Sequence, residues 1–102
     1  MSIMEGRGGV PHVFRASIDT TGREHRLPFW SKYMRIRAAT NPCKIYFTRK
    51  DYDDDANFIT IPVAAAETPH GEWDGPIEAI MVWLRGLGGT SAIELVAIQR
   101  RG

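Results

Sequence analysis

The 102-residue sequence has a single cysteine, no long apolar run and a net charge of only +1. With Cys43 alone, no intrachain disulfide can form, so the fold depends on its core or on its partners. No window approaches the roughly 20 apolar residues of a transmembrane helix, and residues 1–9 lack the apolar segment of a secretory signal. The balanced charge gives no general attraction to nucleic acid or anionic lipid. We therefore expect a protein that is used without export and does not bind membranes, and nucleic acid is an unfavoured partner.

Short strand-like segments separated by turns make up most of the chain. Apolar and polar residues alternate over 32–38 and again over 43–49, which is typical of strands with one buried face. Further strands are expected at 12–18, 58–63, 79–85 and 92–100. No segment has a convincing apolar period of 3.6 residues, and at most one short helical turn is expected, at 64–67. The pattern predicts an all-β fold, a single small antiparallel β-sandwich with a jelly-roll-like or immunoglobulin-like outline.

The two ends of the chain suggest how it is organised. The last two predicted strands flank a glycine-dense segment, 86–91, and are expected to form a β-hairpin that closes a sheet. The first eleven residues are rich in glycine and have little to bury, which predicts a flexible arm. The sequence thus divides into a flexible N-terminal arm, residues 1–11, and a β-sandwich domain, residues 12–102.

A predicted acidic loop carries Asp51, Asp53 and Asp55 at alternate positions. The first three ligands of an EF-hand have this spacing, but Ala56 replaces the required glycine and Pro62 the closing glutamate. Three close carboxylates repel one another unless a cation relieves them, so a looser calcium site is a weak hypothesis. A solvated loop is the favoured interpretation, and no metal or cofactor is expected.

The chain has no recognisable catalytic constellation. The three histidines, His12, His25 and His70, are scattered in the sequence, which favours surface or turn positions over a zinc site. Cys43 shares the parity of a strand's apolar side chains, so a buried thiol is expected rather than a nucleophile. The glycine-rich segment 86–89 lacks the lysine and the helix of a phosphate-binding loop. These observations indicate a protein that is not an enzyme.

Aromatic and arginine side chains are the candidates for partner binding. Tyr33, Arg35 and Arg37 share one face of a predicted strand, and tyrosine and arginine are enriched at protein interfaces. The same stripe would suit base stacking in a single-strand nucleic-acid binder. Trp83 has the opposite parity to the apolar residues of its strand, and Trp73 lies in a predicted loop. Both indoles are therefore expected to be exposed, as anchors for another subunit or as a sugar-binding platform.

Three parts of the chain carry a resemblance to a known class of proteins. They are Tyr33-Met34-Arg35-Ile36-Arg37 with Lys44-Ile45-Tyr46-Phe47-Thr48, the segment Trp73-Asp74-Gly75-Pro76-Ile77, and the closing run from Val82-Trp83-Leu84-Arg85 through Gly89-Thr90-Ser91 to Glu94-Leu95-Val96-Ala97. Together they resemble in style the small β-sandwich virion proteins of tailed bacteriophages, which include capsid decoration or cement proteins and head–tail or tail components. The resemblance covers most of residues 12–101 and transfers no site residue. It implies a non-catalytic protein present in many copies, often as trimers.

The expected function is therefore that of a capsid decoration protein, located in the virion and assembled in the host cytoplasm. It would bind the major capsid protein or other virion proteins and sister copies, as a homo-oligomer with a trimer favoured. A head–tail connector or tail component is one alternative. A second is a carbohydrate- or receptor-binding module that uses Trp73 and Trp83, with calcium at 51–55. A third is a small single-strand nucleic-acid-binding protein.

Overall fold

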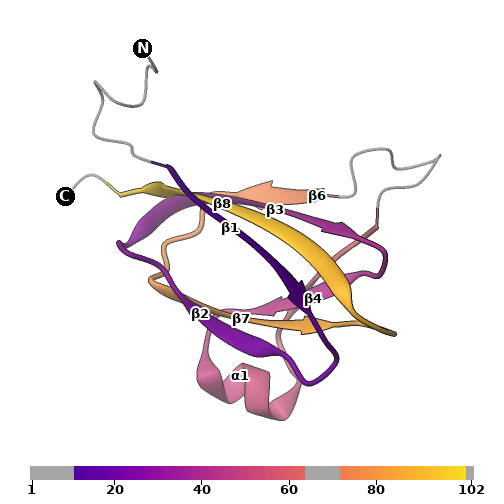
Figure 1. Cartoon of the computed structure of the whole chain (residues 1–102). Helices are drawn as coiled ribbons and strands as arrows, with labels where there is room; N and C mark the ends of the chain where they lie inside the picture. Colours follow the sequence, from indigo (N-terminus) through magenta and orange to yellow (C-terminus); the bar gives the residue numbers. More distant parts are fainter. Residues whose placement is uncertain (1–10, 64–71, 101–102) are drawn as a thin grey trace.

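The computed structural model describes residues 11–63 and 72–100, which form two packed four-stranded β-sheets (Figure 1). The strands are β1 (Pro11–Ile18), β2 (Arg23–Arg26), β3 (Ser31–Ala39), β4 (Cys43–Tyr46), β5 (Ile59–Ile61), β6 (Glu72–Gly75), β7 (Met81–Gly86) and β8 (Ser91–Gln99). One helix, α1 (Arg49–Asp54), accompanies them in this part of the chain. The first sheet has the order β1-β8-β3-β6 and the second the order β2-β7-β4-β5, with antiparallel neighbours. The predicted all-β sandwich is confirmed.

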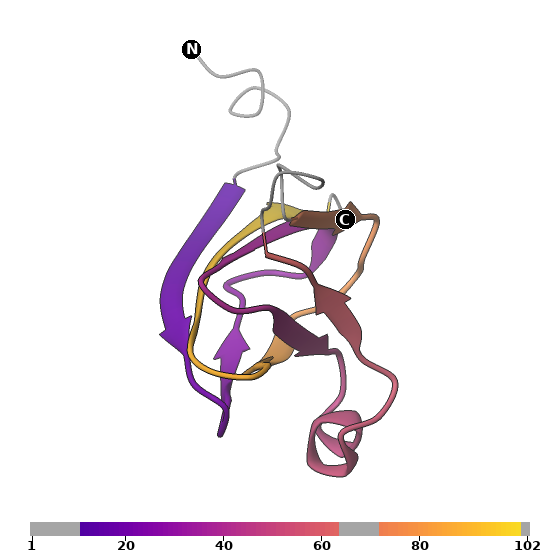
Figure 2. The same ribbon diagram turned by 90° about the vertical axis from the view of Figure 1, so that its right-hand side faces the viewer.

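Alternation along the strands builds the core between the sheets. Met34, Ile36 and Ala38 of β3 are buried, as their spacing predicts, and belong to one cluster with Val82 and Leu84 of β7. Figure 2 shows the strands curving around this common interior, with α1 below them. Since successive side chains of a strand point to opposite faces, the inward set fixes which residues lie on the two outer faces.

The last two strands do not form the predicted β-hairpin. β7 lies in the second sheet between β2 and β4, whereas β8 lies in the first sheet between β1 and β3. The glycine-rich segment therefore carries the chain from one sheet to the other. At its start, Gly86 N–H donates to the carbonyl oxygen of Asp19 (2.8 Å) and Leu87 N–H to that of Pro42 (2.9 Å). Alternation specifies the faces of a strand and not its neighbours, which is why the hairpin prediction was wrong.

The acidic segment contains a helix where a loop was predicted. Thr48 caps the helix, because its hydroxyl oxygen accepts a hydrogen bond from Asp51 N–H (3.1 Å). Asp55 ends it with a φ of 51°, in the left-handed region that aspartate tolerates better than most residues. Two ion pairs at i,i+4 spacing lie on its exposed side: Arg49–Asp53 (3.2 Å) and Lys50–Asp54 (2.6 Å). Its six residues are fewer than two helical turns, too short for an apolar period to be visible.

Other sequence expectations differ from the structure or cannot be compared with it. Within the predicted arm, only Pro11 is among the described residues, where it begins β1; the helical turn expected at 64–67 lies outside them. Strand β2 was missed because its residues, Arg-Glu-His-Arg, have no apolar alternation. In residues 11–63 and 72–100, no helix has the length and apolar character needed to cross a bilayer.

We expect Gly86→Ala to destabilise the fold by about 1–3 kcal/mol, the range seen for overpacked sites. An added Cβ would lie 2.7 Å from the carbonyl oxygen of Ile18 and would also collide with that of Gly89. Both are backbone atoms and cannot rotate away. Gly88→Ala is the matched control, since Gly88 has a φ of 79° and no atom within 4 Å of an added Cβ.

The Gly88→Ala control is expected to lose about 1 kcal/mol of unfolding free energy, the cost of placing alanine in the left-handed region. Urea unfolding followed by circular dichroism measures both variants. Equal losses of unfolding free energy in the two variants would contradict close packing around Gly86, where the chain begins to cross between the sheets.

Candidate functional site

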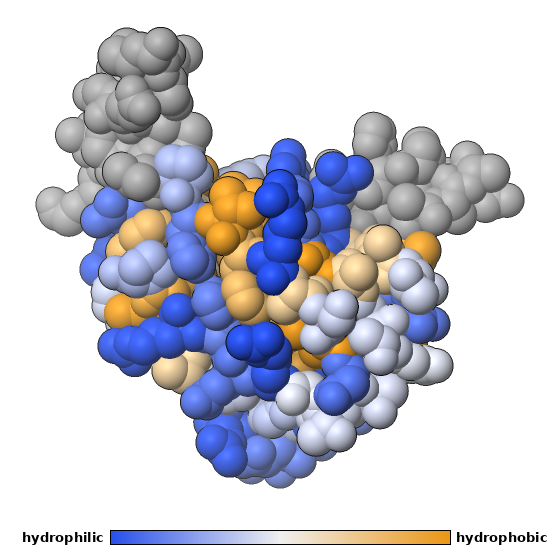
Figure 3. Space-filling model, viewed as in Figure 1, coloured by the Kyte–Doolittle hydropathy of each residue, from blue (hydrophilic) through white to orange (hydrophobic). Residues whose placement is uncertain are grey.

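The outer face of the first sheet carries exposed apolar side chains. The strand register places Pro11, Ile98 and Tyr33 in one row of this face, and Val13, Val96 and Arg35 in the next. Val13 is 48% exposed and Tyr33 38%. We refer to Pro11, Val13, Tyr33, Val96 and Ile98 as the outer patch. In Figure 3 hydrophilic residues cover the lower end of the molecule, over α1, and apolar residues gather further up.

A charged row borders the outer patch, with Glu94 at its centre. The register places Glu94 opposite both Arg15 and Arg37. Arg15 Nε donates to Glu94 Oε2 at 2.8 Å, and Arg35 Nη2 lies 3.6 Å from Glu94 Oε1. The Arg15 hydrogen bond, together with the charges of Arg15, Arg35 and Arg37, holds the pKa of Glu94 below its ordinary value. Glu94 thus lies among three arginines, and the register also places Asp74 of β6 opposite Arg35.

The residues predicted to form a partner interface lie in separate places. Tyr33, Arg35 and Arg37 share the outer face of the first sheet, as predicted. Trp73 lies in β6 and not in a loop; it pairs with Ile36, is half-buried and packs against the core. The expectation of an exposed Trp73 on a loop is therefore wrong, because β6 pairs with β3 and turns this indole inward.

Trp83 lies on the outer face of the second sheet, as its parity predicts, but it is only 8% exposed. The expectation of an exposed indole is wrong here too. Tyr46 and Glu24 flank Trp83 across the sheet, and Phe47 and Met81 lie beside it. Unlike the face that carries the outer patch, this face is covered by the chain that follows β4, a contact that the sequence pattern does not reveal.

A cluster of aromatic and charged groups holds α1 on the second sheet. The Arg85 guanidinium lies over the rings of Tyr46 and Tyr52, 5.4 and 4.3 Å from their centres. Tyr46 Oη donates to Asp55 Oδ1 (2.5 Å), and Lys44 Nζ lies 3.1 Å from the same oxygen. Burial, with the hydrogen bond to Asp55, raises the pKa of Tyr46 to about 12. The same hydrogen bond and Lys44 lower the pKa of Asp55, which acts here as a structural carboxylate.

The three aspartates of the calcium hypothesis have different neighbours. Asp51 accepts a hydrogen bond from Asn57 Nδ2 (3.3 Å), Asp53 pairs with Arg49, and Asp55 belongs to the cluster around Tyr46. Within residues 11–63 and 72–100, no three histidine, cysteine, aspartate or glutamate side chains form a group that could hold a metal ion. The geometry gives no support to a calcium site in this segment.

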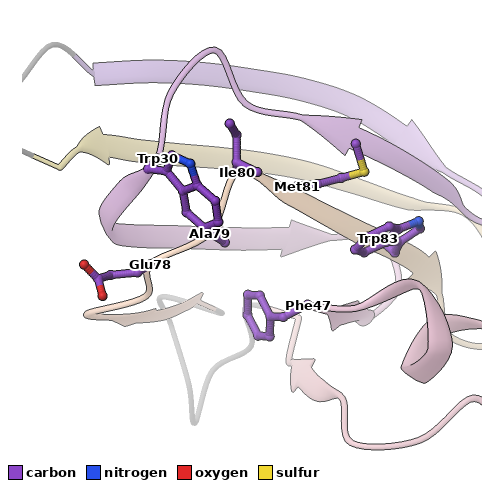
Figure 4. Close-up of a pocket in the computed structure, with 7 residues that line it drawn as sticks. All are labelled: Trp30, Phe47, Glu78, Ala79, Ile80, Met81 and Trp83. Carbon is purple, nitrogen blue, oxygen red and sulfur yellow. The ribbon is translucent and has the colours of Figure 1, made fainter.

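A shallow pocket lies beside the second sheet, lined by Trp30, Phe47, Glu78, Ala79, Ile80, Met81 and Trp83 (Figure 4). Trp30 is 47% exposed. The Arg100 guanidinium lies 5.7 Å from the centre of the Trp30 ring and 3.4 Å from Glu78 Oε1. Sequence reasoning missed Trp30, because the proline two residues earlier indicated only an irregular edge segment.

Two of the three histidines meet at one edge of the sandwich. His12 Nε2 of β1 and His25 Nε2 of β2 lie 3.0 Å apart, although these strands belong to different sheets. The ring of Phe14 stacks on His25, with 3.7 Å between centres. Burial, together with the electrostatic influence of His12 and Arg23, lowers the pKa of His25. Both histidines lie half-buried in strands, so the expectation of surface or turn positions is wrong for this pair. His70 lies outside the described residues.

Cys43 is buried at the start of β4, as predicted. Burial raises the pKa of its thiol to about 11. The thiol is therefore protonated at neutral pH and is a poor nucleophile.

We expect the stability of the fold to fall as the pH drops below 6.5, the ordinary pKa of histidine. Because the folded state holds the pKa of His25 lower, the unfolded chain binds the proton more tightly. The contribution of His25 is complete above pH 6.5 and is lost as the pH falls towards its lowered pKa. His25→Gln removes this titration, so the slope of melting temperature against pH is expected to flatten. An unchanged slope in the variant would contradict the lowered pKa.

Asp55→Asn is expected to lower the melting temperature at neutral pH, because it removes the charge that Tyr46 and Lys44 contact. Asparagine tolerates the left-handed backbone, so the variant isolates the charge. The lowered pKa of Asp55 contributes stability above its ordinary value of 3.8, and this is lost as the pH falls through the lowered pKa. The gap to the wild type should therefore close at low pH. Asp54→Asn, which affects only an exposed pair with Lys50, serves as control, and equal effects in both variants would contradict this role.

Comparison of the chain with protein-family models, with curated proteins and with solved structures finds no match. Function is therefore inferred from the geometry and chemistry of the chain itself.

Proposed function

We propose that this chain is a non-catalytic structural protein that docks on a larger assembly through the outer face of its first sheet. In its most specific form, the proposal is a decoration protein on a phage capsid, bound to the major capsid protein and to sister copies. A head–tail connector or tail component would use the same face. The docking face is therefore the general part of the proposal, and the position in the virion is its more specific part.

The exposed outer patch is the observation that supports this proposal. Val13 and Tyr33 hold large apolar surfaces in water at adjacent rows of a sheet. A contiguous apolar surface on a small protein typically marks a site of contact with another molecule. The opposite sheet provides the contrast, since α1 packs on β4 and β7 there and Trp83 is buried.

The charged row beside the patch suits the rim of an interface. Arginine and tyrosine supply much of the binding energy at protein interfaces, and Arg35, Arg37 and Tyr33 lie together on this face. Glu94 holds Arg15 and Arg35 by ionic contacts, so less side-chain freedom is lost when a partner binds.

A weak contact per copy is sufficient for a decoration protein. A symmetric particle repeats the same interface many times, and contacts between sister copies make binding to the shell multivalent. A trimer around a local threefold axis is the arrangement that we propose.

A carbohydrate- or receptor-binding module is the second candidate function. The exposed Trp30 indole in the pocket favours it, because an aromatic face can stack on a sugar ring and Glu78 can accept hydroxyl hydrogens. A sugar would displace or share Arg100, which lies over the Trp30 ring and pairs with Glu78. Trp30→Ala would then abolish glycan binding by the isolated chain. Binding of glycans that is insensitive to this change would count against the pocket.

Self-association of the purified chain tests the proposed docking face. We expect a concentration-dependent oligomer in sedimentation equilibrium, and we expect Val13→Asp to raise its dissociation constant by about tenfold or more, or about 1.4 kcal/mol. An aspartate at this position would have to lose its hydration in the interface. Leu87→Asp is the matched control, since Leu87 is 37% exposed but lies on the crossing between the sheets. A monomer at every concentration, or equal losses in the two variants, would contradict docking of sister copies through this face.

The particle itself tests the virion assignment. In cells that express the chain from its natural locus, we expect gradient-purified particles to contain it in many copies, as measured by quantitative mass spectrometry. Recovery of the chain only in the soluble fraction, with no particle, would contradict the assignment to a virion. The docking face would still be tested separately, by sedimentation equilibrium.

A further inference from the structure

His12 and His25 approach each other across the gap between the two sheets. β1 and β2 are edge strands of different sheets on the same side of the sandwich (Figure 1). The two Nε2 atoms are 3.0 Å apart, whereas the ring centres are 5.2 Å apart and the ring planes differ by 9°. The nitrogens are thus the parts of the rings that approach each other. One ring donates its proton to the lone pair of the other, so the two Nε2 atoms face each other across the gap between the sheets.

We propose that His12 and His25 bind one transition-metal ion of the zinc type through their Nε2 atoms. Zinc–imidazole bonds of about 2.0–2.1 Å at a tetrahedral angle place two such nitrogens about 3.3 Å apart. To bind the ion, the Nε2 atoms move apart by a few tenths of an ångström and both rings tilt, so that the two lone pairs point at one position. Both rings then carry their proton on Nδ1. Among the described residues no further histidine, cysteine or carboxylate joins the pair, so water fills the other positions of the ion.

The surroundings of the pair hold the rings in place. Phe14 stacks on His25, and Phe29 packs edge-on against His12, with ring centres 6.3 Å apart. Arg23 is the charge that opposes a cation here; its guanidinium lies over the Phe14 ring at 5.2 Å. With two protein ligands and one opposing charge, we expect micromolar and exchangeable binding.

A bound ion would fasten β1 to β2 and close this edge of the sandwich. β1 also carries Val13 and Arg15 on its other face. The ion would therefore steady the strand that contributes the exposed valine of the outer patch. The site itself is independent of whether that patch docks on a capsid.

Titration of the full chain with zinc chloride tests the site. After treatment with a chelator and its removal, isothermal titration calorimetry at neutral pH is expected to show one ion bound per chain. His12→Gln and His25→Gln should each weaken binding by at least about tenfold, because even the loss of a group that only orients a ligand costs that much. His70→Gln is the matched control, because the chain has only three histidines, and its affinity should be unchanged.

A second measurement does not depend on the folding of the variants. X-ray absorption of the zinc-loaded wild-type chain is expected to show two imidazole ligands, and zinc should raise the melting temperature of the wild type. Fewer than two imidazoles, no heat of binding, or equal weakening in His70→Gln would overturn the site. In each of these cases the pair would be a hydrogen bond between strands and no more.

Discussion

The structure depends on the burial of one side of every strand between two sheets. The inward side chains of β3, β7 and β8, such as Ile36, Leu84 and Leu95, are almost completely excluded from water. At roughly 25 cal/mol for each Å² of apolar surface, this burial is the main favourable term in folding. Because the side-chain period of a strand is two, the same constraint sends Tyr33 and Trp83 to the outer faces. What happens on those faces distinguishes the two sheets.

The outer faces of the two sheets differ in what covers them. On the second sheet, Tyr46, Tyr52 and Arg85 stack into a layer that joins α1 to the sheet. Asp55 anchors this layer by accepting hydrogen bonds from Tyr46 and Lys44. The outer face of the first sheet keeps Val13 and Tyr33 exposed. The chain itself thus covers one outer face of the sandwich, whereas the other exposes the apolar side chains that we propose for docking.

The parts of the structure that could be predicted from the sequence are those set by local alternation. The buried set Met34, Ile36 and Ala38 and the outward parity of Trp83 follow from a period of two. The pairing of β7 with β2 and β4 could not be predicted, because a glycine-rich turn permits a crossing between sheets as readily as a hairpin. The burial of Trp83 could not be predicted either, because it depends on Phe47 and the chain that follows β4.

The candidate site divides in the same way. The common face of Tyr33, Arg35 and Arg37 was predicted by alternation along a single strand. The meeting of His12 and His25 depends on two edge strands whose positions are set only by the complete topology.

Adhesion through the outer face of the first sheet is the central claim, and hydroxyl-radical footprinting tests it most directly. The reactivity of Val13 and Tyr33 would be compared between the free chain and the chain in its assembled particle. We expect strong protection of both residues on assembly, with the exposed side of α1 as reactive as before. Protection confined to α1 or to Trp30, with Val13 and Tyr33 unchanged, would contradict the claim.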